Sequence, residues 1–461
     1  MRAETVVIVG AGPAGMRAAI VLAEHGLKPI VLDEAPAGGG QIFRRQPPGF
    51  TRGYGELYGF EAKRARTLHD AFDALGPRID HRPGSLVWNV EGQHLQILRD
   101  GVNETVAFDR LLLATGAMDR VIPFPGWTLP GVYTLGGAQV ALKHQACAVG
   151  GRVVFFGSSP LLPLVAAQYA AAGVDVAAVL DTTPFGVKAA TLPRLMTGGA
   201  TGYKGLWYLA RLALRGIPYR HGITPVTALG EGSVTGFAYL DAQRRRHEIA
   251  CDAIAFGYGL KSEWQLADLA GCRFAFDAGT HQWRVEADGQ GRSSVDCVYL
   301  AGDGARIAGA DVAGETGERA ARAILADLGH PGQGEALASI ARRLDRHAPL
   351  REAIDKAFPF PAHLARDLPD ECVVCRCEAI SAGDLRDAID ALAADDVNRA
   401  KAFSRVGMGR CQGRVCGPVA AEILAAARGC SVAEAGRLRS QPPVKPIPVA
   451  AFAGPDEGEM A

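Results

Sequence analysis

The sequence predicts an α/β fold in which two nucleotide-binding units precede a small helical domain. Residues 5–34 and residues 153–181 each read as an apolar strand, a turn, a helix that ends at glycine, and a second strand that ends in an acid. Five of the ten cysteines lie within residues 372–416, among short helical patterns. These three observations separate a nucleotide-binding part from a cysteine-bearing C-terminal part.

Composition narrows the class of protein. The 461 residues suffice for two or three domains, and the 49 Lys and Arg balance the 49 Asp and Glu, so we expect no nucleic acid partner. An apolar strand begins at residue 6 and no apolar run could span a membrane, which predicts a cytoplasmic protein with neither signal peptide nor transmembrane segment. Structural disulfides are rare there, so clustered cysteines indicate metal binding or redox chemistry.

The first unit carries a complete dinucleotide fingerprint. The strand Val6–Val9 runs into Gly10, Gly12 and Gly15, spaced as G-x-G-x-x-G. Gly10 allows the tight turn, Gly12 lets the backbone approach a pyrophosphate, and Gly15 lets helix and strand pack closely. Because the helix N-terminus then attracts the phosphates, we predict a dinucleotide site here.

An acid about 20 residues after the glycines can bind the ribose hydroxyls. Asp33 fits this spacing best, with Glu34 as a close competitor. The residues of this unit that we expect to contact the cofactor are Gly10, Gly12, Pro13, Ala14, Gly15, Asp33 and Glu34.

Three later stretches identify the dinucleotide. The stretches "GGGQIFR" (38–44), "LLLATGA" (111–117) and "VYLAGDGA" (298–305) resemble, in order, the flavin loop and the second and third FAD signatures of the glutathione and thioredoxin reductase superfamily. The resemblance implies a two-dinucleotide-binding-domain flavoprotein in which the counterpart of Asp303 bonds the ribityl chain of FAD. The helix expected to begin near Gly314–Gly317 points its N-terminus at the flavin. The implied FAD contacts are Gly40, Gln41, Ala114, Thr115, Gly116, Gly302 and Asp303.

The second unit lies where that superfamily binds NAD(P)H, but its fingerprint is damaged. Gly157 remains, whereas Ser159 and Leu162 stand in place of the second and third glycines. Ser159 adds bulk where the backbone should approach the pyrophosphate, and Leu162 should push the helix off the strand unless the packing between them has changed. We expect the fold to be kept, NAD(P)H use to be lost, and the groove to be either empty or taken by an adenine nucleotide. The flavin region also lacks the paired cysteines of a disulfide reductase.

The clustered cysteines pair as Cys375-x-Cys377 and Cys411-x4-Cys416, with 33 residues between the pairs. Four thiolates suit zinc or an iron–sulfur cluster. Structural zinc sites usually space their cysteines as C-x2–4-C, and Cys375-x-Cys377 is tighter than that. Cys372 forms a C-x-x-C with Cys375, so an exchange of ligands also stays open.

The stretch "VCRCE…GMGRCQGRVCGP" resembles the bacterioferritin-associated-ferredoxin-like [2Fe–2S] domain, in the version fused to the C-terminus of certain flavoprotein dehydrogenase subunits. The ligands that this resemblance implies are Cys375, Cys377, Cys411 and Cys416. The expected domains are FAD-binding (1–126 and 286–340), degenerate NAD(P)-binding-like (127–285), linker (341–369), [2Fe–2S]-binding (370–430) and Pro-rich tail (431–461). The tail is either a disordered end or an arm laid over a partner or the cofactor interface.

The order of FAD, degenerate nucleotide domain, FAD and [2Fe–2S] resembles the α (A) subunits of dye-linked amine dehydrogenases over nearly the whole chain. These are opine oxidases, D-hydroxyproline dehydrogenase and hydrogen cyanide synthase. The resemblance implies a D-amino-acid-oxidase-type β subunit that oxidises the amine, so we expect an oxidoreductase of CH–NH donors that does not use NAD, in a hetero-oligomer. It leaves open an FMN at a subunit interface and a small γ subunit. No catalytic residue is assigned to this chain.

Electrons are expected to pass through FAD and [2Fe–2S] to a respiratory or dye acceptor, which leaves open peripheral attachment at the inner membrane. Two alternatives stay open: a hydrogen cyanide synthase-type subunit for glycine, and a free-standing NAD(P)H-dependent FAD/[2Fe–2S] oxidoreductase. The second needs nicotinamide to bind despite Ser159 and Leu162. An iron-storage or sensing partner fits the C-terminal domain alone, but the complete FAD fingerprint argues against it.

Overall fold

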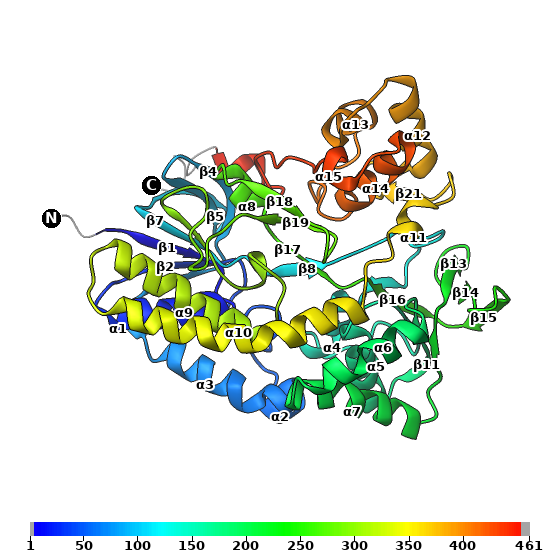
Figure 1. Ribbon diagram of the computed structural model, residues 1–461, viewed down its shortest axis with the longest axis horizontal. Helices are drawn as coiled ribbons and strands as arrows, with labels where there is room; N and C mark the ends of the chain where they lie inside the picture. Colours follow the sequence, from blue (N-terminus) through cyan, green and yellow to red (C-terminus); the bar gives the residue numbers. More distant parts are fainter. Residues whose placement is uncertain (1–3, 453–461) are drawn as a thin grey trace, which may run out of the picture.

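The computed structural model of the protein describes residues 4–452 (Figure 1). Its first sheet is parallel throughout, in the order β20-β7-β1-β2-β3. The strands are β1 (Val6–Val9), β2 (Ile30–Asp33), β3 (Asp80–Pro83), β7 (Arg110–Leu113) and β20 (Val298–Leu300). All four residues of β1 are buried, as its unbroken apolar run predicts for a strand covered on both faces.

Helices α1 (Pro13–Glu24) and α9 (Ala310–Asp327) pack together against this sheet. A Cβ on Gly317 would lie 2.1 Å from the carbonyl oxygen of Ala14, so this glycine lets the two helices cross closely. The expected start of the helix near Gly314–Gly317 is therefore wrong. The helix begins earlier, and its glycine serves packing inside the helix rather than the N-terminal turn.

The second sheet is also parallel, in the order β12-β11-β10-β16-β9. Its strands are β9 (Val132–Thr134), β10 (Arg152–Gly157), β11 (Asp175–Asp181), β12 (Tyr219–His221) and β16 (Ala253–Gly257). Val153 and Phe155 of β10 pack with α5 (Leu161–Ala171), and Phe156 packs in a second core on the other face. The chain therefore has the two-nucleotide-unit α/β fold that the sequence predicts.

Smaller elements surround the two sheets. Two antiparallel sheets have three strands each: β4 (Leu86–Glu91), β5 (His94–Arg99) and β6 (Val102–Ala107) form one, and β13 (Thr224–Leu229), β14 (Gly236–Leu240) and β15 (Arg246–Ala250) form the other. Two antiparallel strand pairs accompany them, β8 (Ala117–Asp119) with β17 (Leu260–Ser262) and β18 (Phe274–Asp277) with β19 (Gln282–Val285). The helices are α2 (Tyr54–Tyr58), α3 (Ala62–Asp73), α4 (Leu135–Lys143), α6 (Phe185–Met196), α7 (Ala200–Leu214) and α8 (Gln265–Leu269).

The C-terminal domain, orange to red in Figure 1, follows α10 (Gln333–Ala357), which runs across the expected boundary at residue 340. Its elements are α11 (Ala362–Arg366), β21 (Val373–Cys375), β22 (Ile380–Ser381), α12 (Ala382–Ala391), α13 (Val397–Ser404), α14 (Gly417–Arg428) and α15 (Val432–Ala435). Its core includes Leu438, past the expected boundary at 430, and is continuous with the core of the second sheet. Trp127 reinforces this junction, because its indole N–H donates to the carbonyl of Val373 at 2.6 Å.

The described part of the tail returns to the first nucleotide unit. The backbone N–H of Val444 donates to the carbonyl of Trp88 in β4 at 3.1 Å, and the rings of Phe452 and Trp88 meet edge to face at 5.7 Å. The tail therefore joins the C-terminal domain to β4. No helix within residues 4–452 is both long enough and apolar enough to cross a membrane.

Candidate cofactor sites

The three FAD signatures meet at the carboxyl edge of the first sheet. Gly10 adopts a φ of +103°, and a Cβ on it would lie 2.3 Å from the carbonyl oxygen of Ala114. A Cβ on Gly302 would lie 2.9 Å from the Cβ of Ala14. The structure thus gathers residues from sites up to about 300 positions apart into one cradle, where glycine lets the segments approach this closely.

The N-terminus of α1 opens into this cradle. Gly12 caps the helix without a side-chain hydrogen bond, and no acidic residue lies in the first turn. Gly40 packs on Gly12, while Gln41 is exposed and accepts a hydrogen bond from Arg44 at 2.8 Å. Free backbone N–H groups at a helix N-terminus attract anions, so the cradle fits the pyrophosphate of FAD.

Asp33 and Glu34 have different surroundings. Both carboxylate oxygens of Asp33 accept backbone N–H groups, from Ala11 and Ala35, and burial raises the pKa of this carboxyl. Glu34 instead lies in an open groove and pairs with Lys445 of the tail. Asp33 therefore shapes the glycine turn, and Glu34 is the acid that faces the groove.

Asp303 lies just after β20, next to the cradle. Its Oδ1 accepts the backbone N–H groups of Ala308 and Gly309 at 2.8 and 3.1 Å, and burial raises its pKa. No donor among residues 4–452 reaches its Oδ2. With Oδ1 fixed by these two hydrogen bonds, Oδ2 can accept the expected hydrogen bond from a hydroxyl of the ribityl chain.

The groove beside Glu34 is basic and reaches the cysteine loop. It has a volume of about 660 Å³, and its charged lining consists of Glu34, Arg44, Arg410, Arg414 and Lys445, together with Cys411. The four cations come from the flavin loop, the cysteine loop and the tail. They give the nucleotide site a positive potential suited to phosphate.

The four predicted metal ligands come together at one end of the C-terminal domain. Cys375 ends β21, Cys416 is the N-cap of α14, and Cys377 and Cys411 lie on the adjoining loops. Hydrogen bonds link Cys416 to Cys375 and to Cys411, and Cys411 to Cys377. A Cβ on Gly409 would lie 2.2 Å from the Cβ of Cys377, so the loop closes on the thiol only because this residue is glycine.

The surroundings favour the thiolate at two of these four thiols, Cys375 and Cys411, whereas burial raises the pKa of Cys377. Hydrogen bonds from the Cys416 thiol, then from backbone N–H groups, lower the pKa of Cys375 to about 6 and that of Cys411 to about 5. The pKa of Cys416 rises well above its ordinary value because its proton is shared with these two neighbours. Thiolates are the form that ligates iron or zinc, and N–H groups aimed at sulfur are typical of iron–sulfur sites.

Cys372 does not belong to this group. Burial, then the neighbouring Glu371, raises its pKa to about 12, whereas the pKa values of Cys375, Cys411 and Cys416 are shifted by one another. Within residues 4–452 no three Cys, His, Asp or Glu side chains converge as a single metal ion requires. The tight Cys375-x-Cys377 spacing departs from that of structural zinc sites, and four thiolates are the ligand set of a [2Fe–2S] cluster.

Glu263 and Arg414 connect the two sites, and no sequence signal pointed to them. The backbone N–H of Glu263 donates to Gly116, and the hydroxyl of Thr115 donates to the carbonyl of Glu263 at 2.5 Å. The carboxylate of Glu263 accepts from Arg414 Nε at 2.6 Å, and Arg414 Nη1 reaches the carbonyl of Cys411 at 3.4 Å. A chain of hydrogen bonds thus runs from the second FAD signature to a cluster ligand.

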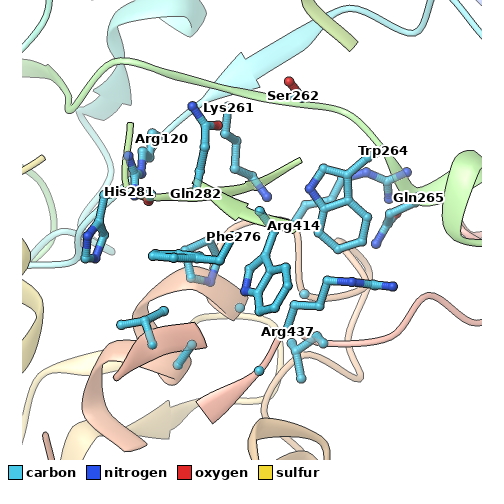
Figure 2. Close-up of a pocket in the computed structure, with 18 of the residues that line it drawn as sticks. Arg120, Lys261, Ser262, Trp264, Gln265, Phe276, His281, Gln282, Arg414 and Arg437 are labelled. Carbon is cyan, nitrogen blue, oxygen red and sulfur yellow. Dashed lines mark hydrogen bonds between the residues drawn. The ribbon is translucent and has the colours of Figure 1, made fainter. Parts of the chain in front are cut away.

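A small pocket lies beside this connection, between β17, β19 and the C-terminal domain (Figure 2). Lys261, Trp264 and Arg414 line it, and its cavity holds about 70 Å³. Burial lowers the pKa of Lys261 to about 8. The space is too small for a nucleotide, so we assign it no cofactor.

The second nucleotide groove is filled by the chain itself. The hydroxyl of Ser158 donates to the carbonyl of Pro359 at 3.4 Å, and the ammonium of Lys188 lies 3.1 Å from the ring centroid of Phe358. Asp181, the acid of this unit, is fully buried and pairs with Lys188 at 3.0 Å. The linker after α10 therefore occupies the edge of the sheet where a dinucleotide binds in this fold.

Comparisons with known proteins agree with this architecture. Residues 4–317 match the pyridine nucleotide-disulphide oxidoreductase family, and residues 373–426 match the BFD-like [2Fe-2S] binding domain. The chain is 35% identical over 451 residues to the A subunit of opine oxidase from Rhizobium meliloti (strain 1021), covering 96% of each chain. It is 35% identical over 459 residues to the HcnB subunit of hydrogen cyanide synthase from Pseudomonas aeruginosa, covering 97% of each chain.

Two solved structures show the same fold. L-proline dehydrogenase from P. horikoshii has a TM-score of 0.71 at 19% identity, covering 97% of this chain and 79% of that chain. Thioredoxin reductase from T. acidophilum has a TM-score of 0.52 at 21% identity, covering 71% of this chain and 99% of that chain.

Proposed function

Because this chain belongs to the family of the opine oxidase A subunits and the hydrogen cyanide synthase HcnB subunits, we propose that it is the electron-transferring subunit of a heteromeric amine dehydrogenase. The family implies an oxidoreductase with FAD and a [2Fe–2S] cluster. The finer proposal is that a D-amino-acid-oxidase-type β subunit oxidises an opine, D-hydroxyproline or a related amine. Electrons then pass through this chain to a respiratory or dye acceptor.

The observation that carries this proposal is the hydrogen-bonded connection between the two cofactor sites. Flavins exchange two electrons with substrates and single electrons with clusters, which is the chemistry a relay needs. Gly116 and Thr115 hold the backbone of Glu263, and the carboxylate of Glu263 holds Arg414 on the cluster loop. These contacts tie the cluster loop directly to the second FAD signature.

The filled second groove supports a donor other than NAD(P)H. Pro359 and Phe358 lie against the turn after β10 and against Lys188, where pyrophosphate and ribose would bind. The buried carboxylate of Asp181 forms an ion pair with Lys188 and accepts hydrogen bonds from the hydroxyl of Tyr219 and from a backbone N–H. A nicotinamide nucleotide would have to displace the linker first. An NAD(P)H-dependent oxidoreductase is therefore the second candidate, and glycine as the amine is a variant of the first.

The test is amine oxidation by this chain alone and by its complex. The chain should be purified by itself and together with a co-expressed D-amino-acid-oxidase-type partner, both with FAD and iron bound. We expect the complex to reduce an artificial dye with an opine, D-hydroxyproline, proline or glycine, and the single chain to be inactive. Turnover by the single chain at the rate of the complex would place the amine site in this chain and contradict the proposal.

A further inference from the structure

Helix α7 (Ala200–Leu214) presents large apolar side chains to solvent. Tyr203, Leu206, Trp207 and Leu214 are 60%, 39%, 40% and 88% exposed. Their spacing of i, i+3, i+4 and i+11 puts them on one stripe of the helix. Phe60, 54% exposed, extends the stripe because its ring meets that of Trp207 at 4.9 Å. We call these five residues the α7 patch.

The α7 patch is not the core-facing side of the helix. Leu212, which is almost fully buried, and the partly buried Tyr208 pack into the core of the second nucleotide unit with α5. The helix therefore has one apolar face inside the protein and another outside it. A second apolar face with several aromatic residues marks a contact surface rather than scattered exposure.

The segment that carries the α7 patch is rich in basic residues. Residues 182–230 contain no Asp or Glu, and their basic residues other than Lys188, which pairs with the buried Asp181, are Arg194, Lys204, Arg211, Arg215 and Arg220. The guanidinium of Arg211 lies 4.7 Å from the ring centroid of Trp207. The acid next to the patch, Glu61, is neutralised by Lys204 and by Arg64. The surface is thus both apolar and cationic.

Its position separates it from the cluster. Figure 1 shows α7 at the lower edge of the molecule, whereas α12 to α15 lie at the upper right. A protein that exchanges electrons with the cluster has to dock near Cys377 and Cys411, at the other end. The α7 patch therefore lies away from the surface where such a protein docks.

We propose that the α7 patch binds the surface of a membrane that contains anionic phospholipids. Trp and Tyr prefer the membrane–water interface, and the leucines and Phe60 reach the boundary with the acyl chains. The flanking Arg and Lys side chains then meet anionic headgroups. This membrane attachment goes beyond the proposed function, and its test does not depend on whether the proposed function is correct.

The experiment measures sedimentation of the FAD- and iron-loaded chain with lipid vesicles. Vesicles of phosphatidylcholine alone are compared with vesicles that also contain phosphatidylglycerol, at low and at high salt. We expect binding to the mixed vesicles only, and weaker binding at high salt because the attraction is screened. The double variant Leu206→Gln/Leu214→Gln should bind at least about tenfold more weakly, since it removes two of the inserted side chains.

Leu392→Gln is the matched control, because this exposed leucine follows α12 in the C-terminal domain. It should bind vesicles like the wild type, and unchanged flavin absorbance should show that all variants fold. Absence of binding to mixed vesicles at low salt would overturn the proposal, as would equal binding by the double variant. A double variant that keeps vesicle binding but no longer copurifies with a partner chain would reassign the α7 patch to a protein interface.

Discussion

The Nε atom of Arg414 lies 2.6 Å from a carboxylate oxygen of Glu263, across 151 residues of sequence. The two side chains are only 10% and 20% exposed. Arg414 belongs to the loop between Cys411 and Cys416, and Glu263 is bonded to the second FAD signature. One nearly buried ion pair therefore connects the segments that form the two cofactor sites.

Breaking this pair should be costly and strongly non-additive. Glu263→Gln or Arg414→Gln alone leaves a buried charge without its partner, which costs roughly 3 kcal/mol. The double variant removes both charges, so its loss should fall short of the sum by about 1–3 kcal/mol. Urea unfolding followed by flavin fluorescence measures the three free energies. The exposed pair Arg273–Glu286 is the control, and Arg273→Gln should change little. Additive single effects would contradict the assignment.

Cys411→Ser should remove iron and leave FAD in place. The hydroxyl of serine is a much poorer ligand than the thiolate that the Cys411 loop stabilises. Cys372→Ala is the matched control and should keep its iron, because burial and Glu371, rather than another thiol, shift the pKa of Cys372. Iron and flavin contents per chain are the readout. Zinc without iron, in protein prepared without oxygen, would show that the cluster assignment is wrong.

NADH and NADPH should reduce the flavin slowly. The linker residues Phe358 and Pro359 occupy the groove, so restoring a glycine by Ser159→Gly should not create a donor site. Anaerobic rapid mixing, followed at the flavin absorbance band, tests both proteins. Bleaching within milliseconds at micromolar nucleotide would favour the NAD(P)H-dependent alternative.

Acid should weaken the fold partly through His69. Its Nε2 lies 3.0 Å from the carbonyl of Phe43, which requires a proton on Nε2, and its Nδ1 lies 2.9 Å from the hydroxyl of Tyr54, which can donate to a neutral ring. Burial, then Arg45, lowers the pKa of His69. Below about pH 6.5 the unfolded chain therefore binds a proton that the folded chain resists, and stability falls.

The variant His69→Gln isolates this effect. At pH 7 the wild type should be the more stable protein, and its advantage should shrink as the pH falls toward 5. Thermal unfolding of both proteins across this range is the measurement. An advantage that stays constant or grows on acidification would mean that His69 is protonated in the folded protein.

The sequence predicted the parts of the fold that depend on local pattern. The apolar run Val6–Val9 and the glycines after it predict a buried strand and its turn without any distant residue. The sequence predicts the start of α9 too late, because Gly317 allows a close contact with Ala14, about 300 residues away, and does not form the turn before the helix. Local pattern says nothing of such a contact.

The same distinction holds at the sites. Spacing alone groups the four thiols, whereas only the folded chain shows that Cys375, Cys411 and Cys416 act on one another while the pKa of Cys372 is shifted by burial and Glu371. The pair of Glu263 and Arg414 joins two segments that carry no shared motif, so only the folded chain shows it. Asp33 and Glu34 are adjacent in sequence, and their different roles come from Ala11, Ala35 and Lys445.

The linker that fills the second groove is also the covalent tether of the cluster domain. Under the proposed function, the residues that shut out a nicotinamide donor are those that carry the polypeptide from one cofactor to the other. A point mutation can widen the groove but cannot remove the tether. Regaining such a donor would require a different path of the backbone after α10. The connectivity of the chain therefore determines which kind of electron donor it can use.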